Sequence, residues 1–177
     1  MAIALLGAGR AIDVQHSKLT LYVDKQGMFA FMADNHEIEA PIASGSFDAD
    51  AKTVELNFDA AKIRVLDPKL SEGRRGEVQA AMVSAKVLDV EHYPQITFRT
   101  TKVDAADATH WTVTGDLTLH GQTHPQNVTV VETDASHFAG TATIRQSTYG
   151  IVPIRIAGGT VAVKDDVRLV FTVTLAP

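Results

Sequence analysis

The stretch that decides the fold is Trp111–Leu119, which reads WTVTGDLTL. Its odd positions carry Trp, Val, Gly and two Leu, whereas its even positions carry three Thr and one Asp. Because successive side chains of a strand point to opposite faces, this alternation predicts a β-strand with one apolar and one wet face. The same alternation recurs at Lys18–Asp24, Thr53–Asp59 and Val167–Leu175. With the weaker runs between them, one of which is a short strand at about 61–66, the sequence predicts about eight antiparallel strands.

The composition agrees with a half-wet sheet. Val, Thr and Ile make up a little over a quarter of the 177 residues. Val and Ile suit any core, but Thr is typical of the solvent side of strands. This excess favours an all-β protein over a helix bundle or a parallel α/β enzyme.

Charge and cysteine content exclude several kinds of partner and chemistry. The net charge is −5 and the largest basic cluster is Arg74-Arg75, so nucleic acid is not an expected partner. The chain has no Cys, which excludes disulfides, a thiolate nucleophile and a cysteine-based zinc site.

One segment breaks the β pattern. Between Asp67 and Val90 the chain is rich in Ala, and Val78, Ala81, Met82 and Ala85 recur at helical spacing. We expect one short helix at about 74–84. A single helix inserted between strands is suited to cover one open end of a closed sheet.

Strands that are apolar on one face bury those faces either by closing into a barrel or by stacking as a sandwich. In a barrel, small inward residues such as Gly115, Gly140 and Ala142 leave space for a ligand, or they simply let the sheet bend. The apolar side chains likewise either line a tunnel or fill an ordinary core. The pattern leaves both alternatives open for the large apolar residues that could line such a tunnel, which are Phe29, Phe31, Met32, Phe58, Phe98, Trp111, Phe138 and Phe171.

A histidine-based metal site is the main rival chemistry. His120 and His124 flank a tight turn, and His92 or His36 could supply a third ligand for an open metal site. The outward register of His120 and the loop position of His124 argue against it. Ser17 follows His16 directly, so the two side chains point to opposite faces, and no Gly-x-Ser-x-Gly elbow occurs. We therefore expect neither a metal cofactor nor a catalytic site.

The N-terminal residues suggest export. Ala2–Gly9 is a short apolar run ending in small residues, which resembles the end of a secretory leader, although no basic residue precedes it. We expect 1–11 to be the remnant of a signal peptide or an apolar extension, and 12–177 to be a single domain. The expected location is the periplasm or the exterior, with the cytoplasm as the alternative. No run is long enough for a membrane span.

Several blocks, in order, resemble the YceI-like family of lipocalin-like, polyisoprenoid-binding proteins. They include the opening strand at His16–Thr20, the helix-to-strand segment Leu88–Phe98, the strand Gly115–Gly121 and the approach to the last strand at Lys164–Val167. One departure occurs at Ala33-Asp34-Asn35-His36, where many relatives carry two histidines and this chain has Asp34 in place of the first.

The resemblance implies an extended, lipocalin-like antiparallel barrel whose interior takes an isoprenoid or fatty-acyl tail. It also implies export to the periplasm and often a homodimer. Asp34, Asn35, His36 and Arg74 are candidates for contacts with the ligand's headgroup. The alternative is a packed barrel that acts as a non-catalytic, stress-related or protein-interaction module. The residues expected to bind the tail are Leu21, Phe29, Phe31, Met32, Ile38, Phe58, Met82, Phe98, Trp111, Val113, Leu119, Phe138, Ala142, Ile144 and Phe171.

Overall fold

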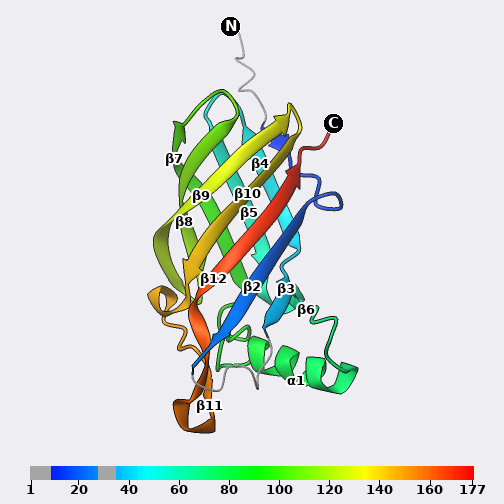
Figure 1. Ribbon diagram of the computed structural model, residues 1–177. Coiled ribbons are helices and arrows are strands. Elements are labelled where there is room, and N and C mark those ends of the chain that lie inside the picture. The colour runs from blue at the N-terminus through cyan, green and yellow to red at the C-terminus, as the bar shows by residue number, and fades with distance from the viewer. Residues whose placement is uncertain (1–8, 28–34) are drawn as a thin grey trace, which may run out of the picture.

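A twelve-stranded antiparallel sheet curls around an apolar interior (Figure 1). The computed structural model of the chain describes residues 9–27 and 35–177. Phe29, Phe31 and Met32 therefore lie outside the described residues. The strands are β1 (Arg10–Ala11), β2 (Lys18–Gln26), β3 (His36–Glu39), β4 (Ile42–Asp48), β5 (Thr53–Asp59), β6 (Arg64–Val65), β7 (Gln95–Ala105), β8 (His110–Leu119), β9 (Gln122–Asp134), β10 (His137–Arg145), β11 (Arg155–Ile156) and β12 (Val161–Thr174).

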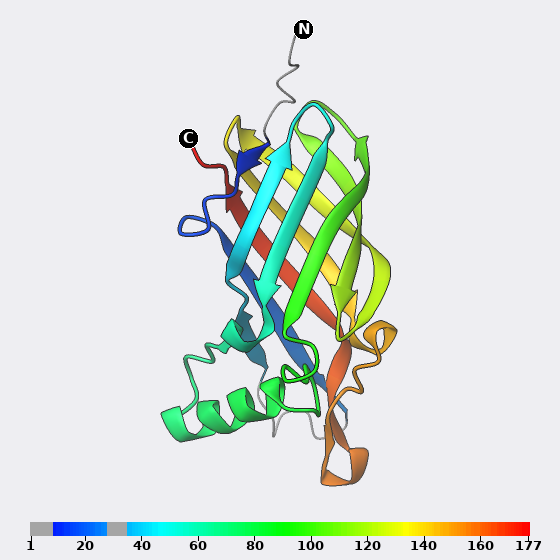
Figure 2. The same ribbon diagram turned by 180° about the vertical axis from the view of Figure 1, so that it is seen from behind.

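The strand order places β2, near the start of the chain, beside β12, the last strand. It runs β1-β4-β5-β7-β8-β9-β10-β12-β2-β3-β6, with β11 beside β12. β3 pairs with β2 while β4 pairs with β5, and only Ala40-Pro41 separates β3 from β4. Next to β1, Ile12 forms a bridge with Leu175 just beyond β12. These links curl the sheet back on itself, which Figure 2 shows from behind.

The antiparallel barrel predicted from the sequence is confirmed, with a small difference in strand number. Three of the twelve strands, β1, β6 and β11, contain only two residues each. Only Ala40 and Pro41 lie between β3 and β4, and Pro41 has no backbone N–H to donate, so the two segments can be counted as one interrupted strand. Eight long strands remain once the short ones are set aside and this pair is counted together.

The alternation in β8 has the expected consequence. Val113 and Leu117 are buried, whereas Thr112 and Asp116 are exposed. β8 is paired along its length with β7 on one side and β9 on the other. It is therefore a central strand whose apolar face forms part of the barrel's inner wall.

The helix is α1 (Glu72–Val83), two residues longer at its start and one residue shorter at its end than predicted. Ser71 caps it, because its hydroxyl accepts a hydrogen bond from the backbone N–H of Arg74 at 3.4 Å. Gln79 ties it to the sheet by donating to Ile63 O (2.9 Å) and accepting from Val65 N (2.8 Å). The helix lies across the lower end of the barrel as drawn in Figure 1. No helix among the described residues has the length and apolarity needed to cross a membrane.

Three short 3-10 helices complete the described structure. They are η2 (Ala60–Lys62), η3 (Gln146–Tyr149) and η4 (Ala157–Gly159). η2 occupies part of a segment that the sequence suggested as a strand at about 61–66, where only β6 is extended. Asp59 caps η2 by accepting a hydrogen bond from Ala61 N at 3.0 Å, which favours the turn over a continued strand.

Candidate functional site

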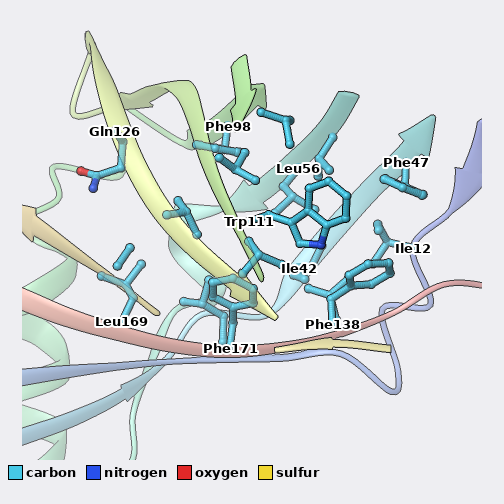
Figure 3. A pocket seen from close by; sticks show the side chains of 18 of the residues that line it. Ile12, Ile42, Phe47, Leu56, Phe98, Trp111, Gln126, Phe138, Leu169 and Phe171 are labelled. Carbon is cyan, nitrogen blue, oxygen red and sulfur yellow. The ribbon is translucent and has the colours of Figure 1, made fainter. Parts of the chain in front are cut away.

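The barrel contains two adjoining cavities. The upper cavity has a volume of about 460 Å³. Its lining includes Ala49, Lys52 and Ala135 from loops between strands and no residue of α1. Five aromatic side chains project into it from different strands around the barrel (Figure 3). They are Phe47, Phe98, Trp111, Phe138 and Phe171. Its polar lining side chains are Lys52, Gln126 and Glu132, so the wall is almost wholly apolar.

The lower cavity has a volume of about 550 Å³ and lies between the barrel and α1. The helix contributes Val78, Ala81 and Met82 to its wall, and the strands contribute inward residues such as Leu21 and Ile38. The helix thus does more than cover the barrel's end, because its apolar face forms one side of the cavity.

Five residues line both cavities and form a waist between them. They come from five different strands around the barrel, so the waist is a ring of side chains. These residues are Leu19, Phe58, Leu117, Ile144 and Leu169. Four belong to the barrel's two buried apolar clusters, in which Leu19 packs against both. We take the two cavities and the waist together as the candidate site.

The small inward residues have a use that the sequence did not reveal. A Cβ atom on Gly115 would overlap the ring of Phe98, and one on Gly140 would overlap the ring of Phe171. Each glycine therefore lets a phenyl ring from the neighbouring strand lie close against the wall. The rings occupy the space above the glycines, and the open volume lies further inside the barrel.

The structure brings the described candidate residues together around this interior. Twelve of the fifteen line at least one cavity, and the other three lie outside the described residues. The upper cavity holds Phe98, Trp111, Val113, Phe138, Ala142 and Phe171; the lower holds Leu21, Ile38, Met82 and Leu119; Phe58 and Ile144 line both. That these side chains bind a ligand stays a prediction.

Sequence reasoning missed three members of the waist, Leu19, Leu117 and Leu169. All three occupy the inward register of strands that the alternation had identified, so the signal was present. It also missed Lys25, which follows Leu21 and Val23 on the inward face of β2 and lines the lower cavity. Its signal was the alternation of β2, which places Lys25 in the same register as Leu21 and Val23.

Polar groups gather at the lower cavity. His36 and Arg74, both candidates for headgroup contacts, line it together with Lys25, Glu77 and Gln146. Asn35 does not line it and instead accepts a hydrogen bond from Lys25 N at 3.2 Å. Asp34 lies outside the described residues.

His36 is held by a buried carboxylate. Its Nδ1 atom lies 2.7 Å from Oδ2 of Asp67, whose side chain is only 2% exposed. The other carboxylate oxygen of Asp67 accepts a hydrogen bond from Glu37 N, also at 2.7 Å. A buried charge is costly unless it is paired in this way. The interaction fixes the orientation of the imidazole ring at the cavity wall.

The other histidines do not assemble into a metal site in the described part of the chain, where no three His, Asp or Glu side chains are placed to share an ion. The sequence predicted that His120 lies on the outward face of a strand, but it lies in the turn between β8 and β9. The centroid of its ring is 4.6 Å from that of Tyr93. Its Nδ1 lies 3.1 Å from Tyr149 O. His124 packs edge-on against the ring of Tyr149.

Four histidines close Asp-x-x-His turns. The pairs are Asp13–His16, Asp89–His92, Asp107–His110 and Asp134–His137, with oxygen–nitrogen distances of 2.7 to 2.9 Å. Hydrogen bonding to Asp89 raises the pKa of His92. The N–H of Thr109, followed by the ring and N–H of His110, lowers the pKa of Asp107 to about 2. These exposed pairs stabilise turns and line neither cavity.

Residues 11–175 match the YceI-like domain. The chain belongs to the YceI-like family. Curated relatives include UPF0312 proteins of Pseudomonas putida strain W619, 33% identical over 135 residues, and of Azotobacter vinelandii, 32% identical over 132 residues. These matches cover 71% and 69% of this chain, and 65% and 64% of the relatives, so the chain spans slightly less than two thirds of their length.

Solved structures share the fold of this YceI-like chain. BcnA of Burkholderia cenocepacia superposes with a TM-score of 0.68 at 20% identity, covering 94% of this chain and 99% of BcnA. A polyisoprenoid-binding domain from Saccharophagus degradans, implicated in plant cell wall breakdown, gives 0.62 at 16% identity over 96% of this chain and 99% of that domain. At these identities the likeness establishes the barrel architecture. None of these four proteins is named as an enzyme.

Proposed function

We propose that this YceI-like chain binds a long-chain apolar ligand, of isoprenoid or fatty-acyl type, inside its barrel and shields it from water for carriage or storage. The observation that carries the proposal is the pair of adjoining apolar cavities, about 460 and 550 Å³ in volume. Both volumes fall within the range of small-molecule binding sites. The name of the S. degradans neighbour supports an isoprenoid in particular.

Burial of methylene groups supplies the binding energy in this proposal. Each buried CH₂ contributes about 0.8 kcal/mol, so a chain lying along the cavities gains affinity from its length. The residues that contact the tail are the twelve described candidates and the waist. No cofactor and no catalytic step is part of this function.

The alternative is a packed barrel that serves only as a protein-interaction module. The cavities favour the carrier, because a packed core holds few voids larger than a water molecule. Native mass spectrometry of the protein purified without added lipid separates the two functions. Co-purified lipid, or binding of an added long-chain isoprenoid, supports the carrier. Repeated preparations that carry no lipid and bind no isoprenoid would exclude it.

Substituting Ala142 tests where the ligand lies. Ala142 lines the upper cavity from β10, and the indole of Ala142→Trp would fill part of that volume. We expect this variant to lose long-chain ligands while its melting temperature stays close to that of the native protein. In a packed barrel the same change would overpack the core and cost about 1–3 kcal/mol.

The matched control is Thr141→Trp, on the exposed face of the same strand. It adds an indole of equal size outside the barrel and should leave ligand binding unchanged. Binding of long-chain ligands by Ala142→Trp at native affinity would mean that the ligand does not lie in the upper cavity.

Export to the periplasm and assembly as a homodimer complete the proposal. Both rest on the family's properties and, for export, on the apolar run at Ala2–Gly9. Light scattering coupled to size exclusion would report the oligomeric state, and fractionation of cells that express the complete natural protein would report its location. A monomer at micromolar concentration, or recovery in the cytoplasmic fraction, would contradict the corresponding part.

A further inference from the structure

The Asp67–His36 pair is built unlike the other Asp–His pairs of the described chain. Those at the four Asp-x-x-His turns join residues three apart in exposed loops, whereas His36 and Asp67 are 31 residues apart. Asp67 also has a φ of 24°, a left-handed value that a residue with a side chain rarely adopts. Hydrogen bonds to both its carboxylate oxygens, and from Leu70 N to its carbonyl at 3.0 Å, hold it there. Strain maintained in this way is typical of functional sites.

This arrangement determines what the imidazole presents to the cavity. A carboxylate only accepts hydrogen bonds, so Asp67 requires a proton on Nδ1 of His36. Nε2 is then the free nitrogen, which accepts a hydrogen bond when the ring is neutral and donates one when it is protonated. Within the described residues no group is hydrogen-bonded to Nε2 of His36, and the residue lines the lower cavity.

Arg74 makes the polar lining of the lower cavity suitable for a negative group. Lys25 from β2 and Arg74 from α1 line the same cavity, and Glu77 is the one carboxylate among its lining residues. Arg74 forms no ion pair with any described carboxylate. Asp67 is occupied by His36 and by the backbone. A headgroup beside His36 thus meets an imidazole whose orientation Asp67 fixes, in a cavity that Arg74 also lines and whose wall toward Val23 and Ile38 is apolar.

We propose that the lower cavity selects lipids with an acidic oxygen headgroup, a carboxylic acid or an alkyl phosphate, and that His36 binds the head through Nε2. This inference rests on the proposed function and names the ligand's polar end. The acid's O–H bond breaks and its proton forms the Nε2–H bond, or the anion arrives and Nε2 takes the proton from solvent. Either route leaves an imidazolium between two oxyanions, Asp67 on one side and the ligand on the other. Such charge-assisted hydrogen bonds are among the strongest in proteins.

Calorimetric titration of the full chain, stripped of lipid, with palmitic acid, hexadecyl phosphate, hexadecanol and methyl palmitate tests the proposal. These probes share an apolar chain and differ in the head. We expect one or both acidic probes to bind at least about tenfold more tightly than the ester, the difference that one charge-assisted hydrogen bond supplies. The stronger of the two acids identifies the head as carboxylate or phosphate.

His36→Gln should remove that preference by weakening binding of the acid about tenfold or more, with a much smaller change in the affinity for the ester. The matched control is His16→Gln, because His16 also lies 2.7 Å from an Asp oxygen but lines neither cavity. It should bind all four probes as the native protein does. Asp67→Asn provides a second route to the same result, since an amide supports the imidazolium less well than a carboxylate, and circular dichroism of each variant checks folding.

The direction of the bound chain gives an independent readout. Trp111 is the only Trp of the chain and lines the upper cavity. With the head at His36, palmitic acid brominated at its terminal carbon should quench Trp111 fluorescence more strongly than the acid brominated beside its carboxyl group. The reverse order would overturn the assignment of the head to the lower cavity.

The outcomes separate the two proposals. Equal affinities for acids and ester, or equal weakening of both by His36→Gln, would overturn the headgroup site and leave the apolar carrier intact. Failure of all four probes and of long-chain isoprenoids to bind would overturn both.

Discussion

At the scale of single residues, the barrel's interior depends on glycines placed beneath aromatic rings. The ring of Phe98 lies where a side chain at position 115 would begin, and Phe171 has the same relation to Gly140, its direct cross-strand partner. Each ring covers a glycine and also lines the upper cavity. The upper cavity is therefore wider than it would be if Gly115 and Gly140 carried side chains, because the two rings could then not lie so close to the wall.

Gly115→Ala should push the ring of Phe98 inward. The added methyl group would overlap both the ring and the backbone oxygen of Arg99, so we expect a loss of stability of about 1–3 kcal/mol, as in other overpacked cores. Chemical denaturation measures it. The control is Gly76→Ala in α1, where a Cβ meets no atom within 4 Å, and which should stabilise by about 0.5–1 kcal/mol. Equal effects of the two changes would contradict the role given to Phe98.

The sequence predicted that Gly115, Gly140 and Ala142 face inward, because strand alternation fixes direction. It did not predict which of them border open space. Whether a small residue borders open space depends on the rotamer of its neighbour on the next strand. Which residue is that neighbour depends on how the two strands pair, and the alternation within one strand does not reveal the pairing. The Asp67–His36 pair escaped for a related reason, since it joins residues 31 positions apart.

At the scale of elements, the Asp-x-x-His turns set the ends of several strands. In the β7–β8 loop, Oδ1 of Asp107 accepts hydrogen bonds from Thr109 N and His110 N at 2.8 and 2.9 Å. Each of these turns closes its loop with a hydrogen bond from the ring nitrogen of His to the carboxylate of Asp. As the pH falls, protonation of these carboxylates should weaken the turns before it affects the packing of the apolar interior.

The lowered pKa of Asp107, about 2, makes a pH-dependent contribution to stability. In the unfolded chain its pKa is near 3.9, so the ionised carboxylate stabilises the fold above about pH 4, and this contribution is lost as the pH falls toward about 2. Asp107→Asn should flatten the fall of the melting temperature over that range. Asp50→Asn should not, because the side chain of Asp50 forms no hydrogen bond or ion pair with any other described residue. Equal curves for both variants would contradict the prediction.

The helix was predictable from its spacing of apolar residues to within two positions, because amphipathic periodicity persists over several turns. Its start was placed too late, since Ser71 and Glu72 carry the capping signal before the apolar residues begin. The strand predicted at about 61–66 is extended only at β6. There Asp59 initiates η2 through a local side-chain hydrogen bond, which competes with strand pairing.

At the scale of the whole molecule, the waist divides the interior into two volumes of similar size. In the carrier proposal, affinity rises by about fourfold for each methylene, equivalent to about 0.8 kcal/mol, as long as the growing chain finds apolar wall. A chain that passes the waist continues to gain affinity in the second cavity. A chain that cannot pass it reaches a plateau.

Leu117→Phe should lower the chain length at which this plateau occurs. Leu117 is 6% exposed and lines both cavities, so a larger side chain there narrows the waist. A homologous series of alkyl ligands, measured by calorimetry, reports the plateau. Thr118→Phe, the next residue along β8 and pointing to the other face, is the control and should leave the series unchanged. An unshifted plateau in Leu117→Phe would mean that ligands do not pass the waist.

The strand order has a consequence for how copies of this protein meet. In the described part of the chain, the path of paired strands starts at β1 and finishes at β6, each only two residues long. Long unpaired strands offer rows of free N–H and C=O groups that template intermolecular pairing and aggregation, and very short ones do not. The two strands that end this path are therefore poor templates for pairing with a second copy. We therefore expect that two copies are not joined by strand pairing at β1 or β6.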